Sequence, residues 1–143
     1  PHLDAEKLIQ HVTFHLADSL PRSALRQLEL SIEDMPENER KQQRREKYET
    51  LLDAGYGSCV LREPEAAEIV HDALFRFDGK RYRLVAWVIM PNHVHVLLEV
   101  LPGFLLARVI QSWKSFTARR INEWLEDEGR RAGARRSQRA TDV

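Results

Sequence analysis

The chain has 143 residues, and its 22 basic and 22 acidic side chains leave a formal net charge of zero. This length is that of one domain with a single core, and the balanced charge indicates neither an acidic nor a basic partner. The single cysteine, Cys59, excludes an internal disulfide and a cysteine-rich metal cluster. No stretch approaches the roughly 20 uninterrupted apolar residues of a membrane span, and the N-terminus lacks the pattern of a secretion signal. We therefore expect a cytoplasmic protein.

The first half of the chain predicts one strand followed by a helical insertion. Residues 8–16 alternate between apolar side chains and a face that carries His11 and His15, as in a half-buried strand. Residues 23–53 favour two helices separated by a Met-Pro pair, and the second is almost entirely charged up to Tyr48. Its run RKQQRREK could bind a nucleic-acid backbone, but such runs are more often a solvated helix face.

The second half predicts a helix, two strands and a long helix. Pro64 stands at a first-turn position, and an Asp-Gly pair marks the turn before a strand over residues 81–90. A Pro-Asn pair separates that strand from a second one over residues 93–100, so the two are expected to pair as a hairpin. Aromatic and aliphatic residues recur at helical spacing over residues 104–125, which favours a core helix over a base-stacking surface.

The order of these elements predicts one α+β domain over residues 1–128, with the helical insertion at about 23–53. An antiparallel sheet with helices packed on one face follows from that order. It corresponds to a ferredoxin-like arrangement without its last strand. Residues 129–143, GRRAGARRSQRATDV, have no apolar periodicity and are predicted to be a basic, disordered tail.

Two histidines separated by one valine are the main candidates for chemistry. Because successive side chains of a strand alternate, His93 and His95 share one face at about 7 Å between Cα atoms, so both imidazoles can bind one metal ion. The same spacing occurs by chance in strands with one solvated face, and a structural role is therefore the alternative. His11 and His15 are expected on the same face, either as a source of a third ligand or as ordinary half-solvated residues.

Three segments, QHVTFHLADSLP, RYRLVAWVIMPNHVHVLLEV and QSWKSFTARRIN, resemble the single-tyrosine HUH transposases, in particular the IS200-like, REP-associated tyrosine transposases. The resemblance covers about residues 1–122. It implies a ferredoxin-like fold, with His93 and His95 holding a divalent ion, magnesium or manganese. It also implies single-stranded or hairpin DNA as the partner. A tyrosine on a later helix would attack a DNA phosphodiester during transposition.

The tyrosine nucleophile that the resemblance implies has no match in this sequence. Tyr48, Tyr56 and Tyr82 all precede the histidines, and the family's YI-x-x-NP run is absent. We therefore expect a transposase-family domain that binds DNA and a divalent ion but is incomplete on its own. The alternatives are a nickase that uses another nucleophile, and a non-catalytic DNA- or protein-interaction module whose histidines are structural.

Lys114, Arg119 and Arg120 are the candidates for contacts to DNA phosphates, because they lie largely off the apolar stripe of the last helix. The resemblance also allows a homodimer, since some relatives exchange the tyrosine helix between two chains. Two imidazoles alone favour zinc, manganese or iron, so magnesium would need additional oxygen ligands.

Overall fold

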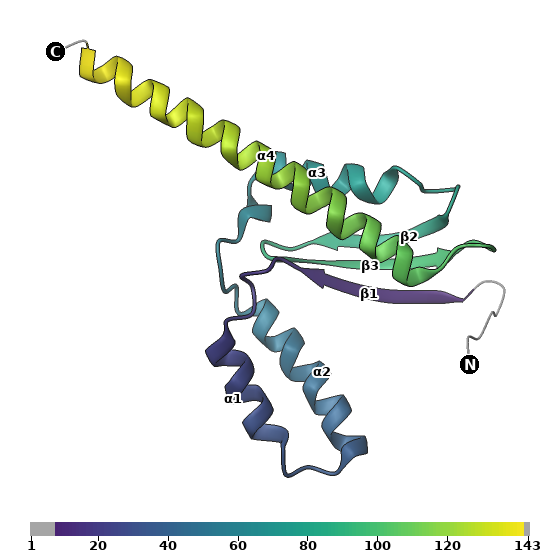
Figure 1. Ribbon diagram of the computed structural model, residues 1–143. Coiled ribbons are helices and arrows are strands. Elements are labelled where there is room, and N and C mark those ends of the chain that lie inside the picture. Colours follow the sequence, from purple (N-terminus) through teal and green to yellow (C-terminus); the bar gives the residue numbers. More distant parts are fainter. Residues whose placement is uncertain (1–7, 142–143) are drawn as a thin grey trace.

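The computed structural model describes residues 8–141, with side chains up to Arg136, and contains a sheet and helices in the predicted order (Figure 1). The elements of this part are β1 (Ile9–His15), α1 (Arg22–Ile32), α2 (Glu37–Asp53), the short 3-10 helix η1 (Val60–Arg62), α3 (Pro64–Phe75), β2 (Tyr82–Ile89), β3 (His93–Val100) and α4 (Leu106–Thr141). The predicted α+β class is confirmed.

The three strands form an antiparallel sheet in the order β1-β3-β2. β2 and β3 form the expected hairpin, so the strand with the two histidines is central and β1 lies at one edge. The register aligns His15 with His93 and Thr13 with His95. Because directly paired residues point to the same side of a sheet, β1 and β3 present their histidines on one face, which we call the histidine face.

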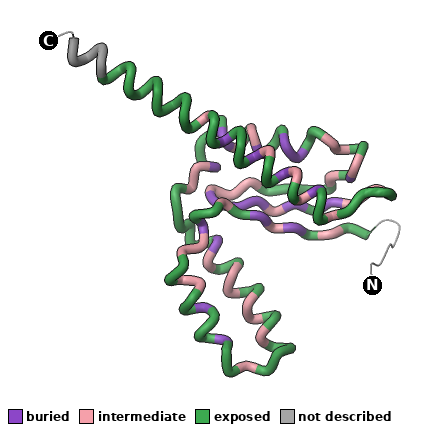
Figure 2. The backbone as a smooth tube through the Cα atoms, viewed as in Figure 1, coloured by how far each residue is buried: buried purple, intermediate pink, exposed green. Residues whose placement is uncertain are grey.

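The opposite face of the sheet is buried under α3 and α4 (Figures 1 and 2). The alternating residues of β1 and β3 contribute most of this core, as their patterns predict: Val12, Phe14, Val94, Val96 and Leu98. Trp113 of α4 is the largest fully buried side chain. Its Nε1 donates a hydrogen bond to the hydroxyl of Tyr82 at 3.0 Å, and that hydroxyl donates to the carbonyl of Leu74. One polar chain therefore joins α4, β2 and α3.

α1 and α2 form a helical hairpin that projects from the end of β1, away from α3 and α4 (Figure 1). Leu28 and Ile32 are its buried residues in α1, whereas α2 buries only Leu52. Glu29 and Arg44 join the two helices by an ion pair of 2.9 Å. The hairpin corresponds to the helical insertion predicted at 23–53, and α2 is solvated along most of its length, as expected.

α4 is longer than the sequence pattern predicted. It continues to Thr141, so residues expected in a disordered tail at 129–143 are helical as far as the described part extends. Arginine, glutamate and alanine have high helix propensity, and ion pairs such as Arg131 with Glu128 at 3.1 Å add support. Apolar periodicity arises where a helix packs against other elements, and a helix can form without it. Residues 125–136 of α4 are all exposed (Figure 2). Within residues 8–141, no helix has the combination of length and apolar character needed to cross a membrane.

Candidate functional site

His93 is the most enclosed side chain of the histidine face, with 1% of its surface exposed. The neighbouring Asn92 is also buried, and its Nδ2 donates to the backbone oxygen of Tyr56 at 3.2 Å. Because a backbone carbonyl can only accept, the amide is oriented with its oxygen toward His93. Nδ1 of His93 therefore donates to that oxygen at 2.7 Å, which leaves Nε2 with the lone pair of a neutral imidazole.

The Nε2 atom of His93 is buried and has no hydrogen-bond partner in the described part of the chain. The carboxylate oxygen Oδ1 of Asp53, at the end of α2, lies 3.5 Å from it. Burial lowers the pKa of His93, and the neighbouring His95 lowers it further, whereas Asp53 acts in the opposite direction. The ring is therefore kept neutral, and a neutral imidazole fixed through one nitrogen with the other unpaired is the form that ligates a metal ion.

His95 lies beside His93, with 4.9 Å between the ring centroids and nearly perpendicular planes. Its Nδ1 is 3.1 Å from Nε2 of His11 and 3.1 Å from the hydroxyl of Thr13, and the His11 ring stacks on it at 5.2 Å. β1 thus orients His95 through Nδ1, and Nε2 makes none of these contacts. The structure brings the two predicted metal ligands together on one face.

His15, aligned with His93 in the neighbouring strand, is bound to the turn that follows β1. Its Nδ1 donates to the carbonyl of Leu16 at 2.8 Å and lies 2.9 Å from the hydroxyl of Ser19. In residues 8–136, no group of three or more histidine, cysteine, aspartate or glutamate side chains is arranged to hold a metal ion. A third protein ligand is therefore not assigned, and two imidazoles are the candidate donor set.

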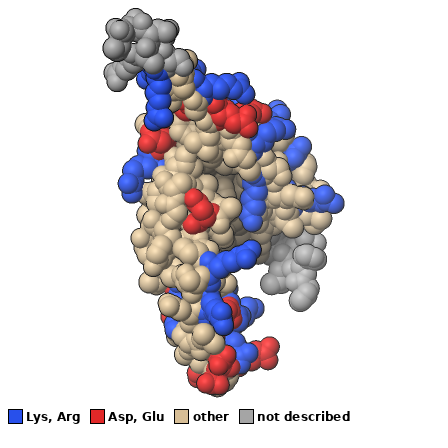
Figure 3. All heavy atoms as spheres, turned by 60° about the vertical axis from the view of Figure 1, so that its left-hand side comes forward, with Lys and Arg blue, Asp and Glu red and all other residues tan. Residues whose placement is uncertain are grey.

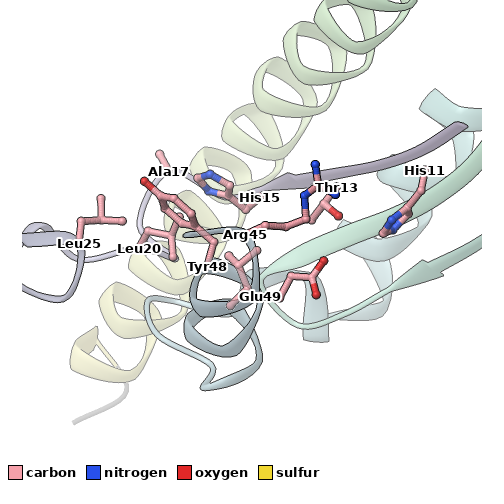
Figure 4. A pocket seen from close by; sticks show the side chains of 10 residues that line it. His11, Thr13, His15, Ala17, Leu20, Leu25, Arg45, Tyr48 and Glu49 are labelled. Carbon is pink, nitrogen blue, oxygen red and sulfur yellow. The ribbon is translucent and has the colours of Figure 1, made fainter. Parts of the chain in front are cut away.

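A groove of about 740 Å³ lies between β1 and α2 (Figure 4). Two of its lining residues, Thr13 and His15, are paired in the sheet with His95 and His93. β1 lines it with His11, Thr13 and His15, and the turn after β1 and the start of α1 add apolar side chains. The lining residues from α2 are Arg45, Tyr48, Glu49 and Leu52. These four positions follow helical spacing, a signal that was present in the sequence but hidden by the high charge of the helix. In Figure 3, basic and acidic side chains both lie beside a largely uncharged part of the surface.

The three tyrosines of the chain occupy different environments. Tyr48 lines the groove, and Tyr56 is exposed in the loop whose backbone accepts the hydrogen bond of Asn92. Tyr82 lies in the core with its hydroxyl bound to Trp113. Burial raises the pKa of Tyr82, so this phenol stays protonated and inaccessible.

The predicted phosphate-binding residues lie away from the histidine face. Lys114, Arg119 and Arg120 belong to α4, which packs on the opposite face of the sheet. The guanidinium groups of Arg119 and Arg120 lie 5.9 and 5.6 Å from the ring centroid of Phe116. Their role in DNA binding stays a prediction.

Comparison with known protein families gives a match over about half of the chain. A family model described as "Transposase IS200 like" matches residues 62–135. This range runs from η1 into α4 and includes His93 and His95, whereas β1 and the α1–α2 hairpin lie before it. No curated protein and no solved structure matches the chain.

Proposed function

The chain belongs to the family of IS200-like transposases, and from this premise we propose that its histidine face binds a divalent metal ion and single-stranded DNA. His93 and His95 are the proposed metal ligands. One observation carries the proposal: Nε2 of His93 is buried without a hydrogen-bond partner in the described part, beside the imidazole of His95. Leaving a buried polar atom unpaired is unfavourable unless a ligand uses it.

The residues around the pair fit a metal site of the family. Asn92 fixes the orientation of His93, while His11 and Thr13 fix that of His95. Metal-binding histidines are commonly oriented in this way, by a hydrogen bond to the ring nitrogen that does not bind the metal. Two imidazoles supplemented by oxygens of water and phosphate suit manganese, and magnesium with more oxygen ligands. When bound, such an ion would polarise a DNA phosphate and neutralise charge on its oxygens.

The groove beside the histidines supports a single strand of DNA as the ligand. His11, Tyr48 and the apolar side chains near the start of α1 offer surfaces on which bases can stack. Arg45 supplies a positive charge for the backbone. The volume of about 740 Å³ is within the usual range of ligand sites.

The proposal assigns no nucleophile to the chain. The resemblance implies a tyrosine located after the histidine strand, whereas Tyr48, Tyr56 and Tyr82 all precede it. The hydroxyl of Tyr82 is engaged in the core, which excludes it. We therefore expect this chain to bind DNA in a metal-dependent manner without forming a covalent adduct.

Binding of Mn²⁺ tests the metal site directly. We expect His95→Ala to lower the Mn²⁺ affinity at least about tenfold, measured by the electron paramagnetic resonance signal of free Mn²⁺. His71→Ala is the matched control, because His71 is exposed on α3 and stacks on Phe75, away from the histidine face. Equal affinity in the His95→Ala variant and the wild type would show that the pair does not bind the metal.

Binding of DNA is tested with a labelled hairpin that carries a single-stranded extension. We expect salt-sensitive binding that Mn²⁺ strengthens, and no adduct on a denaturing gel. Absence of a shift at low salt would contradict the DNA-binding role, and a covalent adduct would contradict the absence of a nucleophile. Unaltered DNA binding with and without Mn²⁺ would instead favour an interaction module with structural histidines.

A further inference from the structure

We propose that α3 and α4, which cover the sheet face opposite the histidine face (Figure 1), carry a second DNA site. This site binds the backbone phosphates of double-stranded DNA. This inference rests on the proposed function, because DNA is the partner at both faces. The site is an arginine–phenylalanine cluster at the end of α3, the turn before β2 and the middle of α4. Its members are Arg76, Phe77, Arg81, Phe116, Arg119 and Arg120.

The two phenylalanine rings hold the arginines together. The guanidinium carbons of Arg76, Arg119 and Arg120 lie 5.4, 5.9 and 5.6 Å from the centroid of Phe116. Arg81 lies over the ring of Phe77 at 3.7 Å, and Arg76 also approaches that ring at 5.4 Å. Cation–π contacts favour these positions, so the four positive groups are ordered before any ligand binds.

The positive charge of this cluster is largely uncompensated. Arg120 has a carboxylate of Glu123 at 3.9 Å. Among the described residues, Arg76, Arg81 and Arg119 have no carboxylate within 4.0 Å. Four like charges gathered on two rings repel one another. An anionic ligand would relieve that repulsion.

The geometry favours phosphates over bases as the groups bound. Guanidinium groups already contact both rings, at 3.7–5.9 Å from the centroids, so they would compete with a stacking base for the aromatic surface. A stacked guanidinium keeps its N–H edges free as oriented donors, the arrangement that recognises phosphate oxygens. An ordered set of donors suits the regularly placed phosphates of a duplex, whereas the groove beside the histidines suits a flexible single strand.

Two triple variants, each of which removes three positive charges, test this site. We expect Arg76→Gln, Arg81→Gln and Arg119→Gln together to lower the affinity for a short blunt duplex at least about tenfold and to reduce the slope of log K against log salt by about 2–3, measured by fluorescence anisotropy. The control changes three arginines that are paired with carboxylates elsewhere, Arg44, Arg130 and Arg131, to glutamine. Unchanged duplex binding in the cluster variant, or an equal loss in the control, would overturn the proposal.

Phe116→Leu tests whether the ring is needed to order the arginines, because it leaves their charge unchanged. It removes the ring that holds three guanidinium groups and keeps an apolar side chain at the position. We expect weaker duplex binding with a thermal midpoint close to that of the wild type. Wild-type duplex affinity in this variant would show that the ring does not order a binding site.

Mn²⁺ binding measured in the same variants distinguishes this inference from the function on which it rests. Loss of duplex binding with intact Mn²⁺ binding is the expected result. Intact duplex binding with intact Mn²⁺ binding would overturn the second site alone. A wild-type protein that binds the duplex but not Mn²⁺ would leave the second site standing and contradict the metal site.

Discussion

At the scale of single residues, Asn92 is the side chain on which the orientation of the metal site depends. Its amide joins the backbone oxygen of Tyr56 to the buried Nδ1 of His93, and both groups would lose a partner in Asn92→Ala. We expect a loss of unfolding free energy of about 1–3 kcal/mol, because the two partners become unsatisfied. We also expect Mn²⁺ affinity to fall about 10- to 100-fold, as it does when the hydrogen-bond partner of a metal-bound histidine is removed.

Denaturant unfolding and Mn²⁺ titration measure these two effects separately. Asn122→Ala is the control, since Asn122 is exposed on α4. A variant at Asn92 that is destabilised but retains the wild-type Mn²⁺ affinity would show that the amide supports the loop and does not prepare the histidine.

The hydroxyl of Tyr82 predicts a pH-dependent contribution to stability. Burial raises its pKa in the folded state above the ordinary value of about 10. A raised pKa means that the contribution is present below pH 10 and is lost as the pH rises through the folded pKa, because only the unfolded state then releases the proton. We therefore expect the wild type to lose more unfolding free energy than Tyr82→Phe between pH 9 and 11.

The same variant also leaves the buried indole N–H of Trp113 unpaired. At pH 7 we expect Tyr82→Phe to lower the unfolding free energy by about 1–3 kcal/mol. Tyr56→Phe serves as the control, since its exposed hydroxyl makes no such bond. Parallel pH profiles in wild type and Tyr82→Phe would contradict the role of burial.

At the scale of elements, strands were predicted better than helices. β1 and β3 follow from alternation, because one face of each is buried under α3 and α4 and the other is more exposed, except at His93. A shared face for the histidines of β1 and β3 could be expected from that pattern. The register of His15 with His93 and the edge position of β1 could not, since they depend on how the connections between the strands run. The helical end of α4 was not predicted, because residues 125–136 are exposed and a helix segment that is not packed shows no apolar periodicity.

The projecting end of α4 makes a prediction about helix propensity alone. A Cβ atom at Gly129 or Gly133 would meet nothing within 4 Å, and both glycines lie inside the helix. Replacing both by alanine should favour the helix by about 1 kcal/mol per site. We expect a stronger circular dichroism signal at 222 nm with an unchanged thermal midpoint, because this segment does not contact the core. An altered midpoint would show that the end of α4 unfolds together with the domain.

At the scale of the whole molecule, the sequence predicts some parts of the proposed metal and DNA site and not others. The spacing of His93 and His95 gave the candidate ligands, and the match over residues 62–135 contains both. Asp53 and the groove could not be read from the sequence, because α2 reaches the histidine face only through the path of the α1–α2 hairpin. The hairpin buries three large side chains, Leu28, Ile32 and Leu52, so it is joined to the sheet less firmly than α3 and α4 are.

Hydrogen exchange measured along the whole chain can detect the difference in stability between the α1–α2 hairpin and the rest of the domain. It can also detect both proposed DNA sites. Without ligand, we expect slow exchange in β3 and α3 and faster exchange in the α1–α2 hairpin, because few buried contacts oppose its local opening. Single-stranded DNA with Mn²⁺ should slow exchange in residues 45–53, which line the groove or adjoin it. A blunt duplex should instead slow exchange at residues 76–81 and 116–120. Protection of the same segments by both ligands would contradict the assignment of single strand and duplex to opposite faces, since one surface would then serve both.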